Sequence, residues 1–217
     1  MSGIRPPSFS RETPAACTLL LTAIAAVVLM AFHPTGRELH DAAVPLAVLW
    51  RNSIVHGLVI LAVGLQTWGA LALVRRLRSP LVGLAECAFV AQCFAALGAT
   101  IAAICSGFVM NDFLVAGADG AGAAVGRDVI WPVNQAFAKV FTVAGSAAIA
   151  GWSLAGWRGG LHRATVLFGL VVGSAATLLV AGGHVRLHLH GMGAVVLAHE
   201  IWWVCVGVQL LRLRTGA

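Results

Sequence analysis

The sequence predicts an all-α integral membrane protein whose six transmembrane helices form an antiparallel bundle. The first observation is the composition, because 59% of the 217 residues are hydrophobic and only 10% are charged. A soluble domain is about 45–50% apolar and about 25% charged, so this chain has too little polar surface to cover a globule in water. The second observation is that apolar residues come in continuous runs of about 20, the length that crosses a bilayer as a helix.

Six such runs divide the chain into a single polytopic membrane domain, 1–217. A transmembrane β-barrel would show alternating polar and apolar residues, whereas these runs are continuous, so helices are the expected spanning elements. We expect no attached soluble domain, so the function is expected to lie in or on the membrane. The predicted spans cover residues 14–32, 53–74, 81–109, 131–157, 164–181 and 190–211.

The ends of the spans follow from local signals. Residues 1–32 begin with basic residues, as a signal peptide does, but no A-x-A-like cleavage site follows, so we expect an uncleaved first span. The connection 33–52 has an apolar later part, 41–50, that is expected to lie along the membrane interface with Trp50 as its anchor. Residues 110–130 are rich in glycine and alanine and are expected to form a second external connection.

The arginines predict the orientation in the membrane. Nine fall on one side of this topology and four on the other, and the richer side is expected to be cytoplasmic. Both termini would then be cytoplasmic, in the inner (plasma) membrane. The basic residues are not interleaved with aromatics, so we expect contacts with the lipid bilayer and no nucleic acid, with room left for a homo-oligomer or a membrane partner subunit. The nine are Arg5, Arg11, Arg75, Arg76, Arg78, Arg158, Arg163, Arg212 and Arg214.

Histidines gather on the opposite, outer side of this topology. Seven of the eight belong there, and six lie at or inside the predicted spans. Imidazole is the commonest metal ligand, and it suits zinc, copper, nickel and iron. The leading hypothesis is therefore a transition-metal site near the outer, periplasmic face that serves metal binding, transport or catalysis. The candidate ligands are His33, His56, His184, His188, His190 and His199.

Four further polar residues could support such a site. Lys139 is the only lysine of the chain, and it lies inside the fourth span, where an ionisable group is costly and usually faces a bundle interior. Glu200 lies at comparable depth on the sixth span and is the expected counter-ion. Asn134, Gln135 and Glu200 are candidates to orient the imidazole N–H bonds. In the alternative interpretation, Lys139 only snorkels to the interface.

A weak internal repeat suggests how the histidines could meet. Trp68 follows the "HG" of His56 by twelve residues, and Trp202 follows the "HG" of His190 by the same interval. Arginine-rich sequences, "RRLR" and "RLR", come next in both cases. If the two hairpins were related by pseudo-symmetry, His33 and His184 would join the other two histidines at the outer mouth of the bundle. Chance similarity in so apolar a chain is the alternative.

Three other functions remain open at this stage. A b-type haem could be ligated by His33 or His56 together with His188 or His199, with its propionates on Arg51 and Arg186. An intramembrane metal-dependent enzyme could use Glu200 or Lys139 to act on a metal-bound water. A purely structural bundle would use its histidines for hydrogen bonds between helices. A haem protein is red and a metal-ion protein can be colourless, so an absorption spectrum separates the first alternative from the leading hypothesis.

Overall fold

The fold is seen in a computed structural model that describes residues 12–35, 38–39, 44–77, 81–116, 124, 126–184, 187 and 189–212. These ranges are helical throughout most of their length and contain no strand, and six helices are long and apolar enough to cross a membrane. The predicted all-α membrane class is confirmed to that extent. The elements are α1 (Glu12–Phe32), α3 (Leu46–Arg76), α4 (Val82–Ile104), the π-helix η1 (Cys105–Val109), α5 (Met110–Ala116), the π-helix η2 (Gly126–Ile130), α7 (Trp131–Gly159), α8 (Arg163–Ala181) and α9 (Leu189–Arg212).

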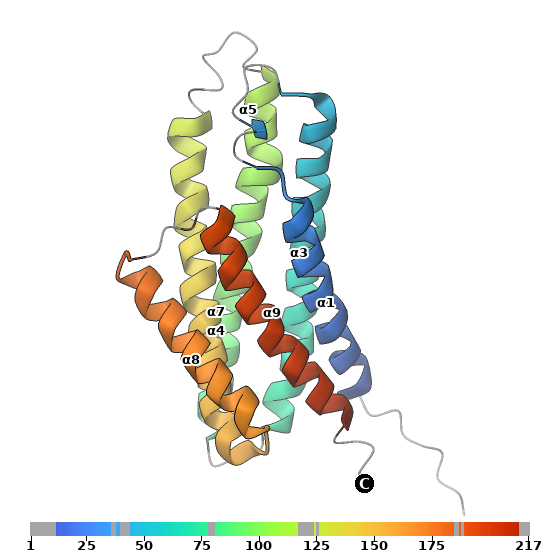
Figure 1. The fold of residues 1–217 in the computed structure, drawn as a ribbon, viewed down its shortest axis with the longest axis vertical. Coiled ribbons are helices and arrows are strands. Elements are labelled where there is room, and N and C mark those ends of the chain that lie inside the picture. The colour runs from blue at the N-terminus through green and yellow to red at the C-terminus, as the bar shows by residue number, and fades with distance from the viewer. Residues whose placement is uncertain are drawn as a thin grey trace, which may run out of the picture.

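The long helices run alternately up and down an elongated bundle (Figure 1). Along one side of the bundle, α3 packs on α4, α4 on α7 and α7 on α8, while α1 packs on both α3 and α9. The helix α9 crosses the face that is nearest the viewer, and it also contacts α8 and α7. The end at which α1 stops and α3 starts is called the His33 end below, and the opposite end is called the Arg76 end.

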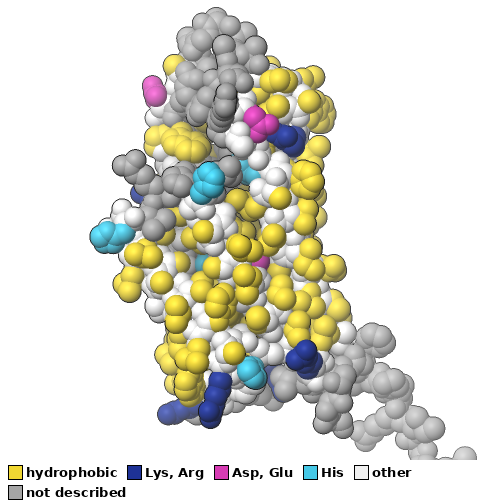
Figure 2. Space-filling view, viewed as in Figure 1, with side chains coloured by type: hydrophobic (Ala, Val, Ile, Leu, Met, Phe, Trp, Pro, Cys, Tyr) yellow, Lys and Arg dark blue, Asp and Glu magenta, His cyan; other side chains and the backbone are white. Residues whose placement is uncertain are grey.

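Charged side chains lie mainly at the two ends of the bundle. Figure 2 shows hydrophobic side chains over the middle of one face, with Lys and Arg side chains gathered toward the Arg76 end. The helix ends there carry Arg75, Arg76, Arg158, Arg163 and Arg212. This is the asymmetry from which the sequence predicts that both termini are cytoplasmic, and the orientation itself stays a prediction.

Two predicted boundaries are wrong, because helices extend into the predicted external connections. The helix α3 begins at Leu46 rather than at residue 53, directly after Pro45. Trp50 therefore belongs to this long helix, where it is 63% exposed, and not to a separate segment before it. The third span continues beyond residue 109 through η1 and α5 to Ala116. Polar side chains in both extensions pair with one another, and hydropathy alone does not register such pairing.

The core of the bundle is a tryptophan cluster between α7 and α9. Trp152, Trp202 and Trp203 are each at most 2% exposed. The rings of Trp152 and Trp202 are stacked at 6.1 Å, and Trp203 meets each of them edge-on at 5.3 and 4.8 Å. The indole N–H of Trp152 donates to the carbonyl of Ala85, 3.0 Å away, so the cluster also fastens α4. These buried rings hold the helices that carry the polar groups described below.

Candidate functional site

Two predicted ligands, His33 and His56, meet at one end of the bundle. His33 follows the last residue of α1, and His56 lies in the third turn of α3. Their Nε2 atoms are 3.2 Å apart, and the ring centroids are 4.8 Å apart with the planes inclined at 68°. His56 is 6% exposed, so the pair lies at the edge of the packed interior rather than on an open surface.

Backbone carbonyls fix the protonation of both rings. Nδ1 of His33 donates to the carbonyl of Pro34 at 2.7 Å, and Nδ1 of His56 donates to the carbonyl of Asn52 at 2.8 Å. A carbonyl oxygen can only accept, so each Nδ1 carries the hydrogen and each neutral ring has its lone pair at Nε2. Two lone pairs therefore face one another. Metal-binding histidines are oriented in the same way, by a hydrogen bond from the ring nitrogen that does not bind the metal.

Burial favours the neutral form of His33. It lowers the pKa of this imidazole below its ordinary value of 6.5, and the positive charge of Arg51 acts in the same direction. The hydrogen bond to the Pro34 carbonyl opposes them, but it does not reverse the net shift. At neutral pH the Nε2 of His33 is therefore a free electron-pair donor.

The π-helix η1 lies directly beside His56. A Cβ atom on Gly107 would fall within 3.0 Å of both Cβ and Cγ of His56, so only glycine fits at this position. π-Helical turns occur frequently at functional sites. Gly107 is not among the residues predicted from the sequence, although a glycine inside the apolar run "CSGFV" can mark a close backbone approach.

Asparagine side chains connect η1 and α5 to the start of α3. Nδ2 of Asn111 lies 2.8 Å from the hydroxyl of Ser53 and 2.9 Å from the carbonyl of Gly107. Oδ1 of Asn111 accepts from Nδ2 of Asn52 at 2.8 Å. Asn52 is fully buried, and its Oδ1 has no hydrogen-bond partner among the described residues. A rigid polar network therefore surrounds the carbonyl that orients His56.

A second set of contacts holds the segment that follows His33. The carboxylate of Glu38 accepts from the backbone N–H of Thr35 at 2.7 Å and from its hydroxyl at 3.0 Å. The backbone N–H of Glu38 donates back to that hydroxyl at 3.3 Å, which completes a capping box. Arg51 of α3 pairs with the same carboxylate. These contacts lower the pKa of Glu38 to about 2, the Thr35 N–H contributing most and Arg51 next. Arg51, predicted to bind a haem propionate, thus has a protein partner, while Arg186 lies outside the described residues.

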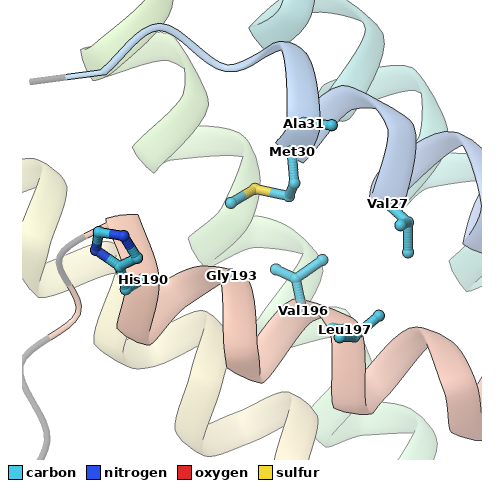
Figure 3. Close-up of a pocket in the computed structure, with 7 residues that line it drawn as sticks. All are labelled: Val27, Met30, Ala31, His190, Gly193, Val196 and Leu197. Carbon is cyan, nitrogen blue, oxygen red and sulfur yellow. The ribbon is translucent and has the colours of Figure 1, made fainter.

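The other predicted ligands do not join the pair. His184 is exposed just after the end of α8, and His190 is exposed at the start of α9, where it borders a groove shared with α1 (Figure 3). His188 lies outside the described residues. Within the ranges that the structure describes, no group of three or more His, Cys, Asp or Glu side chains could hold a metal ion. The predicted four-histidine cluster is therefore not assembled, and the pair stands by itself.

His199 forms a separate contact in the interior. It is 3% exposed, and its Nε2 lies 2.8 Å from the hydroxyl of Ser146 on α7. The ring of Phe141 covers it edge-on at 5.8 Å. His190 and His199 are nine residues apart, which is about 13 Å along a helix, so His199 lies well below the His33 end. A hydrogen bond between α7 and α9 accounts for its environment.

The predicted ion pair between Lys139 and Glu200 is wrong. Lys139 is exposed on the outside of α7. Glu200 is 6% exposed, and its Oε2 accepts from Nε2 of Gln66 on α3 at 2.6 Å. Similar depth does not imply a shared face, because the rotation of each helix about its axis decides where a side chain points. The snorkelling interpretation of Lys139 fits its exposed position better.

Asn134 and Gln135 also do not contact an imidazole. Asn134 donates to the carbonyl of Ala102 on α4 at 2.8 Å. Gln135 donates weakly to Asn134, at 3.4 Å. Their role in the structure is to connect the start of α7 with α4, rather than to orient a metal ligand.

The two hairpins of the sequence repeat have different environments. His56 is buried, whereas His190 is exposed. Trp68 is 52% exposed, whereas Trp202 is completely buried. Matching positions thus face opposite surroundings, and the similarity of the two segments does not extend to their packing.

Comparisons of the chain with protein-family models, with curated proteins and with solved structures give no match. The class of the protein therefore rests on the fold and the site alone. It is a helical protein with six helices able to cross a membrane, and two histidines meet at one end of its bundle.

Proposed function

We propose that this protein is an integral membrane protein that reversibly binds a transition-metal ion, zinc or copper, through His33 and His56 near its outer face. One observation carries the proposal. The two Nε2 atoms are 3.2 Å apart, and each Nδ1 lies within 2.8 Å of a backbone carbonyl that can only accept, which leaves the Nε2 lone pairs facing one another. Facing lone pairs repel each other unless a cation lies between them, and a metal ion supplies that cation.

The separation of the two nitrogens favours a tetrahedral ion. Two nitrogen ligands at about 2.0 Å from a tetrahedral centre are about 3.3 Å apart, whereas neighbouring square-planar ligands are about 2.8 Å apart. The observed 3.2 Å fits the tetrahedral value with almost no movement of the helices. Zinc prefers this geometry, and among the candidate metals we therefore place zinc or reduced copper before nickel and iron.

Two protein ligands leave half of a tetrahedral shell to water or to another molecule. Closed sites with four protein ligands are structural, and sites with open positions exchange or activate what they bind. The unpartnered Oδ1 of Asn52, one helical turn from His56, is a buried acceptor for such a bound water. Reversible binding at a membrane surface fits this arrangement better than permanent structural binding.

The same geometry argues against haem between these two rings. A haem held by two histidines has the iron and the whole porphyrin plane between the two imidazoles. The rings of His33 and His56 are in edge contact, with centroids 4.8 Å apart, and the backbone of Gly107 lies against His56. Inserting the macrocycle would require α1 and α3 to separate, whereas a single ion needs no such change.

The test is metal binding by the purified protein in detergent after removal of bound metal with a chelator. We expect one zinc or copper(I) ion per chain, and we expect His33→Ala and His56→Ala each to abolish it. His184→Ala is the matched control, because His184 is an exposed histidine after α8, and it should bind as the unmodified chain does. If the control and the two pair variants bind alike, or if the unmodified chain binds no metal, the pair only shares a proton and the proposal fails.

A further inference from the structure

A second buried site lies deeper in the bundle, at Glu200. This residue is ten positions after His190 on α9, which is about 15 Å further from the His33 end. Its side chain is 6% exposed, and the amide of Gln66 donates to it at 2.6 Å. An amide can hydrogen-bond a carboxyl group but cannot neutralise a carboxylate. A negative charge at this depth would therefore need a further compensating partner.

The described helices place no cation against Glu200. His199 is the next residue, but its ring bonds to Ser146 on α7. The ionisable groups of α3 that are nearest to Gln66 are His56 and Arg75, nine or ten residues away, so they lie at least about 13 Å along the helix. The other ionisable side chains that the structure describes on the helices around Glu200 are Cys17 on α1, Arg51 and Arg76 on α3, Lys139 and Arg158 on α7, Arg163 on α8, and His190, Cys205 and Arg212 on α9.

A groove between α1 and α9 lies on the same helix as this carboxyl group, nearer the start of α9. It has a volume of about 320 Å³, with His190 at its outer end and Met30 and Val196 extending into it (Figure 3). Gly193 and Val196 line the groove on α9, and Glu200 follows them by seven and four residues. These intervals place all three residues on one face of the helix, with Glu200 one to two turns deeper. The carboxyl group thus lies one to two turns beyond the groove residues on the same face of α9.

We propose that Glu200 carries an exchangeable proton inside the membrane, which it gains and loses from the His33 end of the bundle along the groove between α1 and α9. The bound proton neutralises the carboxylate, while the Gln66 amide donates to the other carboxyl oxygen. No bond other than O–H forms or breaks, and no electrons are transferred. The site shares no residue with the His33–His56 pair, so it can fail or hold independently of the proposed metal binding.

Dicyclohexylcarbodiimide tests the neutral state of Glu200, because this apolar reagent adds a protonated carboxyl group across its C=N bond. The O-acylisourea that forms rearranges by an oxygen-to-nitrogen acyl shift to a stable N-acylurea. The full-length chain is reconstituted in phosphatidylcholine vesicles, and labelled peptides are found by mass spectrometry. We expect labelling at Glu200 near neutral pH, decreasing as the pH rises, and no label at this position in Glu200→Gln. Infrared spectra should show the carbonyl band of a neutral carboxyl group, and this band should be missing in the same variant.

The route is tested by filling the groove. The nearest atom to a Cβ on Gly193 would be Cε of Met30 at 3.8 Å, so Gly193→Leu places its side chain in the groove. Gly64 has no atom within 4 Å of such a Cβ, so Gly64→Leu is a matched control on the outside of α3. We expect Gly193→Leu to slow the H/D exchange of the Glu200 carboxyl group, seen as the shift of its carbonyl band in D₂O, at least tenfold and Gly64→Leu to leave it unchanged. Equal rates in the two variants would overturn the route, and an unlabelled Glu200 without the carbonyl band in the folded chain would overturn the site.

Discussion

The backbone of Gly107 lies so close to His56 that no side chain fits between them. A Cβ atom on Gly107 would come within 3.0 Å of Cβ and Cγ of His56, so Gly107→Ala must displace the imidazole or η1. We expect zinc or copper(I) affinity to decrease about 10- to 100-fold, the usual effect of disturbing the support of a ligand. Titration of the purified variant with zinc or copper(I) measures this affinity. Gly57→Ala is the control, since its Cβ would be 3.6 Å from Phe108, an ordinary contact.

Asn111 is expected to be the most sensitive residue of the polar network. Its amide lies 2.8–2.9 Å from the acceptors on Leu49, Ser53 and Gly107, and Asn111→Asp replaces that donor with an acceptor of the same shape. Buried carbonyls without a partner cost about 1–3 kcal/mol each, so we expect the free energy of unfolding to decrease by about 2 kcal/mol or more. Unfolding in mixed micelles measures this loss. Asn134→Asp, which removes one donor bond, should cost less, and an equal cost would contradict the assigned role.

The tryptophan cluster should dominate the stability of the interface between α7 and α9. Trp152 is completely buried, so Trp152→Ala leaves a large cavity, and we expect a loss of about 3–5 kcal/mol in the free energy of unfolding. Trp157→Ala removes the same ring from a position on α7 that is 52% exposed. The same unfolding assay should therefore show a much smaller change for Trp157→Ala. Similar losses for the two variants would be inconsistent with a core at Trp152.

The capping contact at Glu38 predicts a defined dependence on pH. Its pKa is lowered from 4.5 to about 2, so the charged carboxylate stabilises the fold above pH 4.5 and this contribution is lost as the pH falls toward 2. We expect Glu38→Gln to lower the Tm slightly at pH 6, because the pair with Arg51 is exposed to solvent. The difference from the unmodified chain should shrink at pH 3 and vanish near pH 2. Thermal melts of both chains in detergent measure this difference in Tm. A difference that grows as the pH falls would contradict the capping role of Glu38.

The helices could be predicted from the sequence because spanning a bilayer depends on a local property, the length of an apolar run. The two wrong boundaries, at the start of α3 and at the end of the third span, lie where polar residues interrupt an apolar run. Asn52 and Asn111 lower the hydropathy of their segments, yet they bond to each other at 2.8 Å across α3 and α5. A pairing between positions fifty-nine residues apart is not visible in a hydropathy profile.

The candidate site could be predicted only in part, and for a similar reason. His33 and His56 were both expected at the same level, at the end of one helix and near the start of the next, and the structure brings them together. The predicted ion pair between Lys139 and Glu200 rested only on the similar depth of the two residues along their helices. Depth follows from the sequence, whereas the direction in which α7 and α9 turn their side chains follows from packing at the tryptophan cluster.

X-ray absorption at the metal edge of the loaded protein shows which atoms bind the metal. We expect two imidazole nitrogens at about 2.0 Å, completed by light oxygen ligands, and no protein-bound metal signal in His33→Ala or His56→Ala. Sulfur ligands, three or more imidazoles, or a spectrum unaffected by these substitutions would contradict a metal site built on the facing Nε2 atoms of this pair.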